Sequence, residues 1–287
     1  MTTSEIYSAG YRPFEGERTG WFAAVSTLTW SAVWSILGLG RPARHKVFPV
    51  IVIALAFLPA VVFVGLALLF PVDMFGSEAA PNYWELLRFT WLPVLVFSAM
   101  VVPEALVRDR RNGLFSLYLT TSLTRGRYLL GKAVASVVVL AVVISAPAIL
   151  YLVGLTAEGS GPDSVLNWLG TLGGITLSGG AIAALLIGVG FAISSMTDRR
   201  AFASVALALL FLVAPIVTVA LTESGMSEHW RLLDPAGVAM EFSPRLWGDT
   251  SPEFWALSNF SVFLGQILWL LASWAFVGYR YRKVSAL

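Results

Sequence analysis

The 287-residue sequence is 57% hydrophobic and only 13% charged, with a mean hydropathy of +0.77. A composition this apolar excludes an ordinary soluble domain and indicates a polytopic helical membrane protein. The net charge of +2 gives no reason to expect nucleic-acid binding, and the lack of cysteine excludes disulfides, thiolate metal sites and cysteine nucleophiles.

Residues 1–46 are expected to form a cytoplasmic N-terminal segment with one helix along the membrane surface. Residues 1–19 carry acids and arginines where a signal peptide would carry a compact apolar core. Residues 20–39 have no charge, but Thr27, Ser31 and Ser35 form a polar strip at every fourth position. Several tryptophans in this stretch favour the membrane–water boundary, which indicates an interfacial helix. A spanning helix is the alternative, because the run is about 20 residues long.

Residues 47–287 are expected to form a transmembrane domain of six helices, so the fold class is all-α. Each expected span is an apolar run of about 20 residues or more, the length that crosses the hydrocarbon core. Several runs contain proline, which membrane helices tolerate when neighbouring groups satisfy the freed carbonyls. The expected spans are residues 47–70, 86–107, 128–154, 165–195, 201–221 and 254–278.

The distribution of Lys and Arg predicts the orientation. Six spans put both ends of the chain on one side, and that side holds sixteen of the nineteen Lys and Arg residues. Only Arg88, Arg231 and Arg245 belong to the other side. Because cytoplasmic loops are enriched in Lys and Arg, we expect a multi-pass protein of the cell (plasma or inner) membrane with both termini cytoplasmic.

The large external loop, residues 222–253, is richer in apolar residues than a solvated loop needs to be. We expect part of it to fold back as short helices that enter the outer leaflet, and an ordered surface cap is the alternative. The apolar residues are Trp230, Leu232, Leu233, Pro235, Val238, Met240, Phe242 and Trp247.

Residues 104–132 are the most unusual stretch of the chain, because they place six Lys and Arg residues between two apolar spans. Glu104 and Arg108 have the i, i+4 spacing of a helix-surface pair, which favours a boundary ion pair over a proton relay. Asn112-Gly113 is a turn signal that ends the preceding helix. A short amphipathic helix follows, too short to span, that needs headgroups or a partner groove to cover its apolar face. That face consists of Leu114, Leu117, Tyr118 and Thr121.

Catalytic centres are not indicated. Residues 126–132 fit the spacing GxxxxGK of a phosphate-binding loop, but Ala133 follows where Ser or Thr would hold magnesium. The two histidines, His45 and His229, fall on opposite sides of the membrane in the expected topology and cannot share a zinc site. We therefore expect that the chain is not an enzyme and that it binds no metal.

The stretch from Asp109 to Lys132 resembles a motif of the permease subunits of type-2 ABC exporters. Their segment after the second span commonly reads ER-x-x-GTLELLLATPLSR and continues, a few residues on, with LLGK. The departures here are Leu114 for Thr, Ser116 for Glu and Ser122 for Pro. Residues 194–203 are similar to the family's Ser-rich basic turn between spans four and five, and Asp234-Pro235 is a third similarity. The residues that match the main motif are Gly113, Leu117, Leu119, Thr121, Leu123, Arg125, Gly131 and Lys132.

The resemblance implies a pair of permeases, homodimeric or heterodimeric, bound to two separate ABC ATPase subunits. Residues 112–124 would then be a coupling helix seated in an ATPase groove, and ATP and Mg would bind to the partner, with no cofactor in this chain. The implied coupling residues are Arg110, Asn112, Gly113, Leu114, Leu117, Tyr118, Thr121, Leu123 and Arg125, with a second cytoplasmic contact at Asp198, Arg199 and Arg200.

In this scheme the cavity between two permease copies would carry the substrate outward. Membrane lipid would surround the complex, and no nucleic-acid partner is expected. The apolar external loop and spans favour an amphiphilic or lipid-like cargo. Two other functions stay open: a channel or ion-coupled carrier acting alone, which would need polar groups at mid-span, and a non-transporting membrane scaffold.

Overall fold

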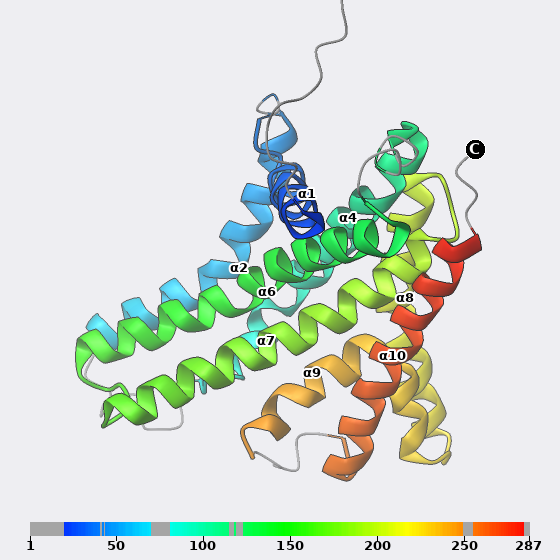
Figure 1. Ribbon diagram of the computed structural model, residues 1–287. Helices are drawn as coiled ribbons and strands as arrows, with labels where there is room; N and C mark the ends of the chain where they lie inside the picture. Colours follow the sequence, from blue (N-terminus) through cyan, green and yellow to red (C-terminus); the bar gives the residue numbers. More distant parts are fainter. Residues whose placement is uncertain are drawn as a thin grey trace, which may run out of the picture.

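The computed structural model describes residues 20–40, 42, 44–69, 81–114, 118, 123–248 and 255–283. All regular structure in these ranges is helical (Figure 1). Six helices are long and apolar enough to cross a membrane, which confirms the expectation of an all-α fold with six candidate spans. They are α2 (Arg44–Leu69), α4 (Leu86–Arg111), α6 (Arg125–Glu158), α7 (Val165–Ser194), α8 (Arg200–Glu223) and α10 (Asn259–Lys283).

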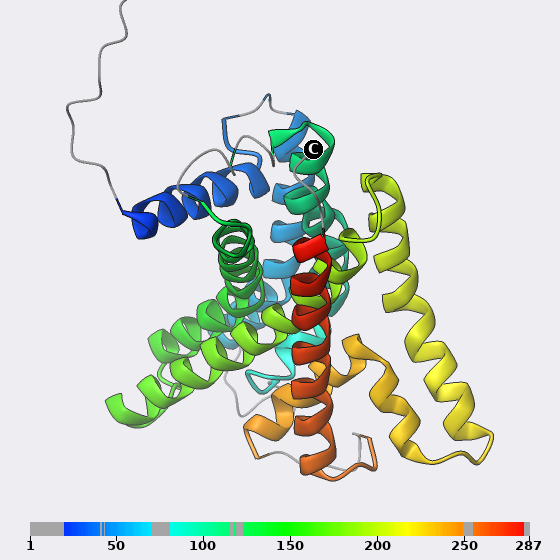
Figure 2. The same ribbon diagram turned by 45° about the vertical axis from the view of Figure 1, so that its right-hand side comes forward.

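Successive long helices run in opposite directions, so the bundle has two chemically different ends. The ends of α4, α7 and α10 and the starts of α2, α6 and α8 lie at the top in Figures 1 and 2. We call this the basic end, because α4, α6, α8 and α10 all carry arginines there. The opposite end, which holds Glu158, Glu223 and Glu228, is the acidic end.

The core consists of α4, α6 and α7. In the most apolar stretch of each helix, 67% of residues are buried in α7 but only 17% in α8. The helices α2, α8 and α10 therefore form the outside of the bundle and expose leucine, isoleucine and valine along their outer faces. Such faces are stable against lipid or another apolar surface and not against water.

Glycines let α7 approach its neighbours closely. At Gly190, a methyl group would come within 2.6 Å of Cγ1 of Val102 in α4 and 3.2 Å of Cδ2 of Leu207 in α8. At Gly170, near the other end of the same helix, nothing lies within 4 Å. Membrane helices use small residues in this way, because close backbone packing takes the place of a hydrophobic driving force.

Hydrogen bonds from three side chains hold α10 against α7 and η1. The indole N–H of Trp274 donates to the carbonyl of Ala184 at 3.2 Å, and the Gln266 amide donates to the carbonyl of Ala181 at 3.1 Å. The Trp269 indole N–H donates to the carbonyl of Leu232 at 2.8 Å. Polar groups between membrane helices need such partners, since lipid offers none.

The first helix, α1 (Trp21–Ile36), lies crosswise over the basic end and packs mainly against α6 (Figure 2). Val25, Leu28, Ala32 and Ile36 are buried on one face, while Trp30 is exposed on another. Of the three residues of the expected polar strip, Thr27 and Ser31 are exposed, whereas Ser35 is half-buried.

The large loop at the acidic end does contain two short helices, η1 (Glu228–Leu233) and α9 (Pro235–Leu246). The helix η1 packs against α8, and α9 packs against α7 and α10. Asp234 joins them and caps α9, because its carboxylate accepts a hydrogen bond from the Ala236 N–H at 3.0 Å. Burial raises the pKa of Asp234 above its ordinary value, and hydrogen bonds from the Gly237 and Ala236 N–H groups partly oppose that rise.

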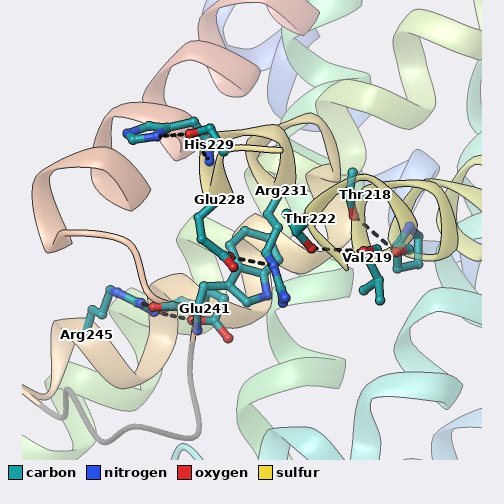
Figure 3. Close-up of polar contacts among 11 residues, drawn as sticks. Thr218, Val219, Thr222, Glu228, His229, Arg231, Glu241 and Arg245 are labelled. Atoms are coloured by element: carbon teal, nitrogen blue, oxygen red, sulfur yellow. Dashed lines mark hydrogen bonds and ion pairs between the residues drawn. The ribbon is translucent and has the colours of Figure 1, made fainter. Parts of the chain in front are cut away.

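An ion pair within α9 holds the chain near Trp255 against this helix (Figure 3). Arg245 pairs with Glu241 one turn earlier, and both residues are buried. The Arg245 guanidinium also donates to the carbonyl of Trp255 at 2.9 Å, and the Trp255 N–H donates to the Glu241 carboxylate at 3.2 Å. Trp255 is thereby held in a loop, and α10 begins at Asn259, later than the expected start at 254. The helix also extends past 278 to Lys283, carrying its basic last turn beyond the apolar run.

The two glycines of α7 provide a matched test of close packing. Gly190→Ala should lower the free energy of unfolding by about 1–3 kcal/mol, because the added methyl group displaces Val102 in a filled core. Gly170→Ala should leave stability unchanged or raise it by up to about 1 kcal/mol, since alanine favours the helix. Thermal unfolding in detergent measures both, and equal midpoints for the two variants would contradict this packing.

Candidate functional site

The segment between α4 and α6 begins and ends at defined helix caps. Asn112 ends α4, with its N–H bonded to the Arg108 carbonyl at 3.0 Å, and Gly113 follows with φ of +66°. A left-handed glycine directly after the cap is the common way for a helix to stop. Thr124 begins α6 and accepts a hydrogen bond from the Arg127 N–H at 3.4 Å. The chain therefore leaves α4 and enters α6 at positions fixed by the local sequence.

Part of the expected coupling helix falls outside the described residues. These are residues 115–117 and 119–122, which include Leu117 and Thr121. Of the residues between the caps, Leu114 and Tyr118 are half-buried and Leu123 is buried in the main core. The Tyr118 ring lies 5.5 Å from the ring of Tyr128 in α6. Burial, and after it the charge of Asp109, raises the pKa of the Tyr118 phenol above its ordinary value.

A buried ion pair joins the end of α4 to the start of α6. Nζ of Lys132 lies 2.7 Å from Oδ2 of Asp109, and each side chain is only 7% exposed. The Tyr128 hydroxyl donates to the same carboxylate oxygen at 2.9 Å. A buried carboxylate needs a cation and further hydrogen bonds to offset its lost hydration, and this arrangement supplies both.

Arg110 joins α4 to the turn between α7 and α8. Its guanidinium donates to the carbonyls of Ser194, of Ser195 at 3.0 Å and of Thr197 at 2.6 Å. The last carbonyls of a helix have no partner within the helix, and α7 ends at Ser194. Arg110 therefore satisfies the last carbonyl of α7 and two carbonyls of the turn after it, and places a positive charge at the negative end of the α7 dipole.

Further contacts extend the connection to α10 and α1. Arg280 of α10 donates to the same Ser195 carbonyl at 3.2 Å, and Arg125 donates to the carbonyl of Arg282 at 2.9 Å. Arg108 donates to the Ser35 hydroxyl of α1 at 3.1 Å. The Arg127 guanidinium lies 5.0 Å from the ring centre of Trp21, within cation–π range.

We call the residues of these contacts the basic-end network. It connects five helices and the α7–α8 turn beside the end of α4 and the start of α6. The network consists of Arg108, Asp109, Arg110, Arg125, Arg127, Tyr128, Lys132 and Arg280.

Glu104 has two arginine neighbours. Nη1 of Arg108 lies 3.9 Å from its carboxylate, at the outer limit for an ion pair, and Nη2 of Arg200 lies closer, at 3.1 Å. The i, i+4 spacing indicated Arg108 as the partner, whereas the shorter pair crosses from α4 to α8. Glu104 therefore links two helices, as well as two turns of one helix.

The residues of the expected second contact lie beside the network. Asp198 is 83% exposed and its carboxylate lies 3.7 Å from Nε of Arg110. The Arg199 guanidinium lies 5.6 Å from the ring centre of Phe202, and Arg200 contacts Glu104. The first and second expected contact surfaces are thus adjacent, joined by the pair Arg110–Asp198.

Sequence reasoning missed the two-helix role of Asp109, Lys132 and Tyr128. Asp109 is the only acid in a run of arginines, and Lys132 stands inside the apolar start of the third span. An unexpected charge at each of two neighbouring span ends is the signal that could have paired them.

Among the described residues, no three or more His, Asp or Glu side chains lie together as metal ligands do. His229 lies at the acidic end, while His45 belongs to the first turn of α2 at the basic end. In the comparisons with known proteins, no family model and no curated protein matches the chain. The resemblance to ABC exporter permeases rests on the short motifs quoted above.

The buried pair can be tested with one single and one double variant. Lys132→Met should lower the free energy of unfolding by about 3–5 kcal/mol, because it leaves the Asp109 carboxylate buried without a cation. Asp109→Asn together with Lys132→Met should recover more than half of that loss, since no charge is left unpaired. Unfolding by denaturing detergent measures both. A double variant that is less stable than Lys132→Met alone would show that the pair is not coupled in this way.

Proposed function

We propose that the protein is the membrane-spanning permease subunit of an ATP-driven exporter of the type-2 ABC class. In this proposal it works as a dimer coupled to separate ATPase subunits. The observation that carries the proposal is the basic-end network, since the motif-bearing segment connects α4 to α6, and these two helices are bonded to each other, to α10 and to the α7–α8 turn. A push on that segment would reach several spans at once.

The proposed orientation puts the basic end in the cytoplasm. The positive-inside rule supports it, because Arg108, Arg110, Arg125, Arg199 and Arg280 all lie at this end. ATP is cytoplasmic, so a coupling segment must lie on that side. The segment 112–124 satisfies this condition in the proposed orientation.

In the proposed membrane placement, α1 lies in the cytoplasmic interface. Its sixteen residues would extend only about 24 Å, less than the roughly 30 Å of a hydrocarbon core. Its exposed Trp30 and Trp34 suit the headgroup boundary, and its crosswise position at the end of the bundle agrees with a helix along a surface (Figure 2).

In the proposed mechanism the partner ATPase binds and hydrolyses ATP, and the helices of this chain move in response. ATP and Mg would bind between the ATPase subunits, and their closure would displace the segment 112–124. The pair Asp109–Lys132 would move α4 and α6 together, and Arg110 would transfer the movement to the α7–α8 turn. Asp198, Arg199 and Arg200 would form the second contact to the ATPase.

Copurification tests the proposal directly. The chain extracted from its native membranes in mild detergent should bring an ATP-hydrolysing subunit with it, detected by mass spectrometry and by phosphate release. A monodisperse, folded chain that carries no ATPase would contradict the proposal and favour a channel, carrier or scaffold.

Two glycines at opposite ends of the bundle give a matched pair for the coupling segment. Gly113 follows α4 with φ of +66°, and Gly225 follows α8 with φ of +88°, a backbone region that proline cannot adopt. Gly113→Pro should lower the amount of copurified ATPase about tenfold, equivalent to about 1.4 kcal/mol of binding free energy. Gly225→Pro should leave it unchanged. Equal retention of ATPase by both variants would remove the segment 112–124 from the interface.

A further inference from the structure

A small cavity lies toward the acidic end of the bundle, where α4, α6, α7 and α9 meet. Its volume is about 20 Å³, and one water molecule needs about 10–15 Å³ on the same scale. The residues that line it are buried except for Tyr83 and Trp247, whose ring centres lie 6.2 Å apart. The cavity therefore has room for a single small molecule, and the two aromatic rings form its border with the surface.

Four hydroxyl-bearing residues line this cavity, one from each of the four helices. The hydroxyls of Ser145 and Ser178 both donate to the carbonyl of Ile175, at 3.3 and 3.1 Å, and Thr90 donates to a carbonyl of its own helix at 3.2 Å. These three oxygens keep lone pairs that can accept a hydrogen bond. Ser243, which is only 2% exposed, forms no hydrogen bond through its hydroxyl within the described part of the chain. The lining therefore offers several acceptors and one donor. The four residues are Thr90 (α4), Ser145 (α6), Ser178 (α7) and Ser243 (α9).

Pro147 adds a backbone group that needs a donor. It lines the cavity from within α6 and has no N–H, so the carbonyl of Val143, one turn earlier, receives no hydrogen bond from it. Val143 is only 3% exposed. In membrane helices the groups that a proline frees are bonded by neighbouring side chains or by ordered waters.

We propose that this cavity binds one structural water molecule, which accepts the Ser243 proton and donates to acceptor oxygens of the other helices. A buried water typically makes about three hydrogen bonds, which matches the mixed acceptors and donor of this lining. Helices bend at prolines and where water enters the ladder of helix bonds. The site therefore marks Pro147 as the point at which α6 can bend. This inference does not depend on the proposed export function.

The lining favours water over an ion. None of the described residues that line the cavity is charged. A metal cation would lose hydration that neutral hydroxyls do not replace, and hard cations bind where carboxylates supply oxygen ligands. An anion would need several donors, whereas three of the four hydroxyl protons are already bonded to carbonyls. A neutral molecule that both donates and accepts satisfies the site.

Radiolytic hydroxyl-radical labelling of the chain in lipid nanodiscs, read by mass spectrometry, tests the proposal. X-rays convert a bound water into a radical that oxidises the side chain beside it, so a buried residue is labelled only where water touches it. Ile182 and Leu186 lie one turn apart in α7 and are each 0% exposed, but only Ile182 lines the cavity. Ile182 should be oxidised and Leu186 should stay unmodified. Equal oxidation of the two residues, or none at either, would overturn the proposal.

Two alanines of α6 give a matched pair of variants. Ala148→Val adds two methyl groups inside the cavity and should reduce the oxidation of Ile182 to the level of Leu186. Ala146→Val makes the same change two residues earlier, outside the lining, and should leave the oxidation of Ile182 unchanged. Equal oxidation of Ile182 in the two folded variants would contradict a water at this place.

Two measurements on the wild-type chain need no variant. A cryo-EM map that resolves ordered waters should show one density within about 3 Å of at least two of the hydroxyl oxygens of Ser145, Ser178 and Ser243. A map of that quality without such a density would overturn the proposal. The midpoint of thermal unfolding should be the same in choline chloride as in sodium chloride. A lower midpoint in choline chloride would assign the cavity to a metal cation in place of water.

Discussion

The bonds from Arg110 to the carbonyls after α7 are the interaction on which the basic end depends. Helix α7 is the most buried of the six candidate spans, and its last residue, Ser194, places its carbonyl beyond the hydrogen bonds of the helix itself. A guanidinium has enough donors to bond several carbonyls at once, and Arg110 donates to that of Ser194 and to those of Ser195 and Thr197 in the turn that follows. The Ser195 carbonyl also accepts a hydrogen bond from Arg280, so α4 and α10 meet at this turn.

Asp109 and Arg110 are consecutive, so their side chains leave α4 in different directions. Asp109 bonds to α6 through Lys132, and Arg110 bonds to the α7–α8 turn. The last turn of α4 is thereby attached on two sides, and the segment 112–124 begins directly after it. In the proposed permease this attachment is what turns a displacement of the segment into a common movement of the spans, because buried, charge-paired contacts do not yield gradually.

Much of this fold could be predicted from the sequence, because hydrophobic length and local caps determine it. The six candidate spans, the stop at Asn112-Gly113 and the short helices of the loop at the acidic end follow from runs of apolar residues and from turn chemistry. The start of α10 was predicted too early, because Trp255 is apolar yet bonded to Glu241 in the loop. The pairs Lys132–Asp109 and Arg200–Glu104 and the cavity among α4, α6, α7 and α9 depend on which helices are neighbours, which a single sequence does not state.

The proposed contact between the segment 112–124 and an ATPase is tested most directly by site-specific photocrosslinking in native membranes. The photoreactive residue would replace Asn112 at the basic end or Glu223 at the acidic end. Both positions are exposed at a helix end, so a photoreactive residue fits at either one. The proposed coupling through the segment 112–124 predicts a covalent adduct between position 112 and an ATP-hydrolysing subunit, and none from position 223. An adduct to the ATPase from position 223, or none from position 112 in a complex that still contains the ATPase, would contradict it.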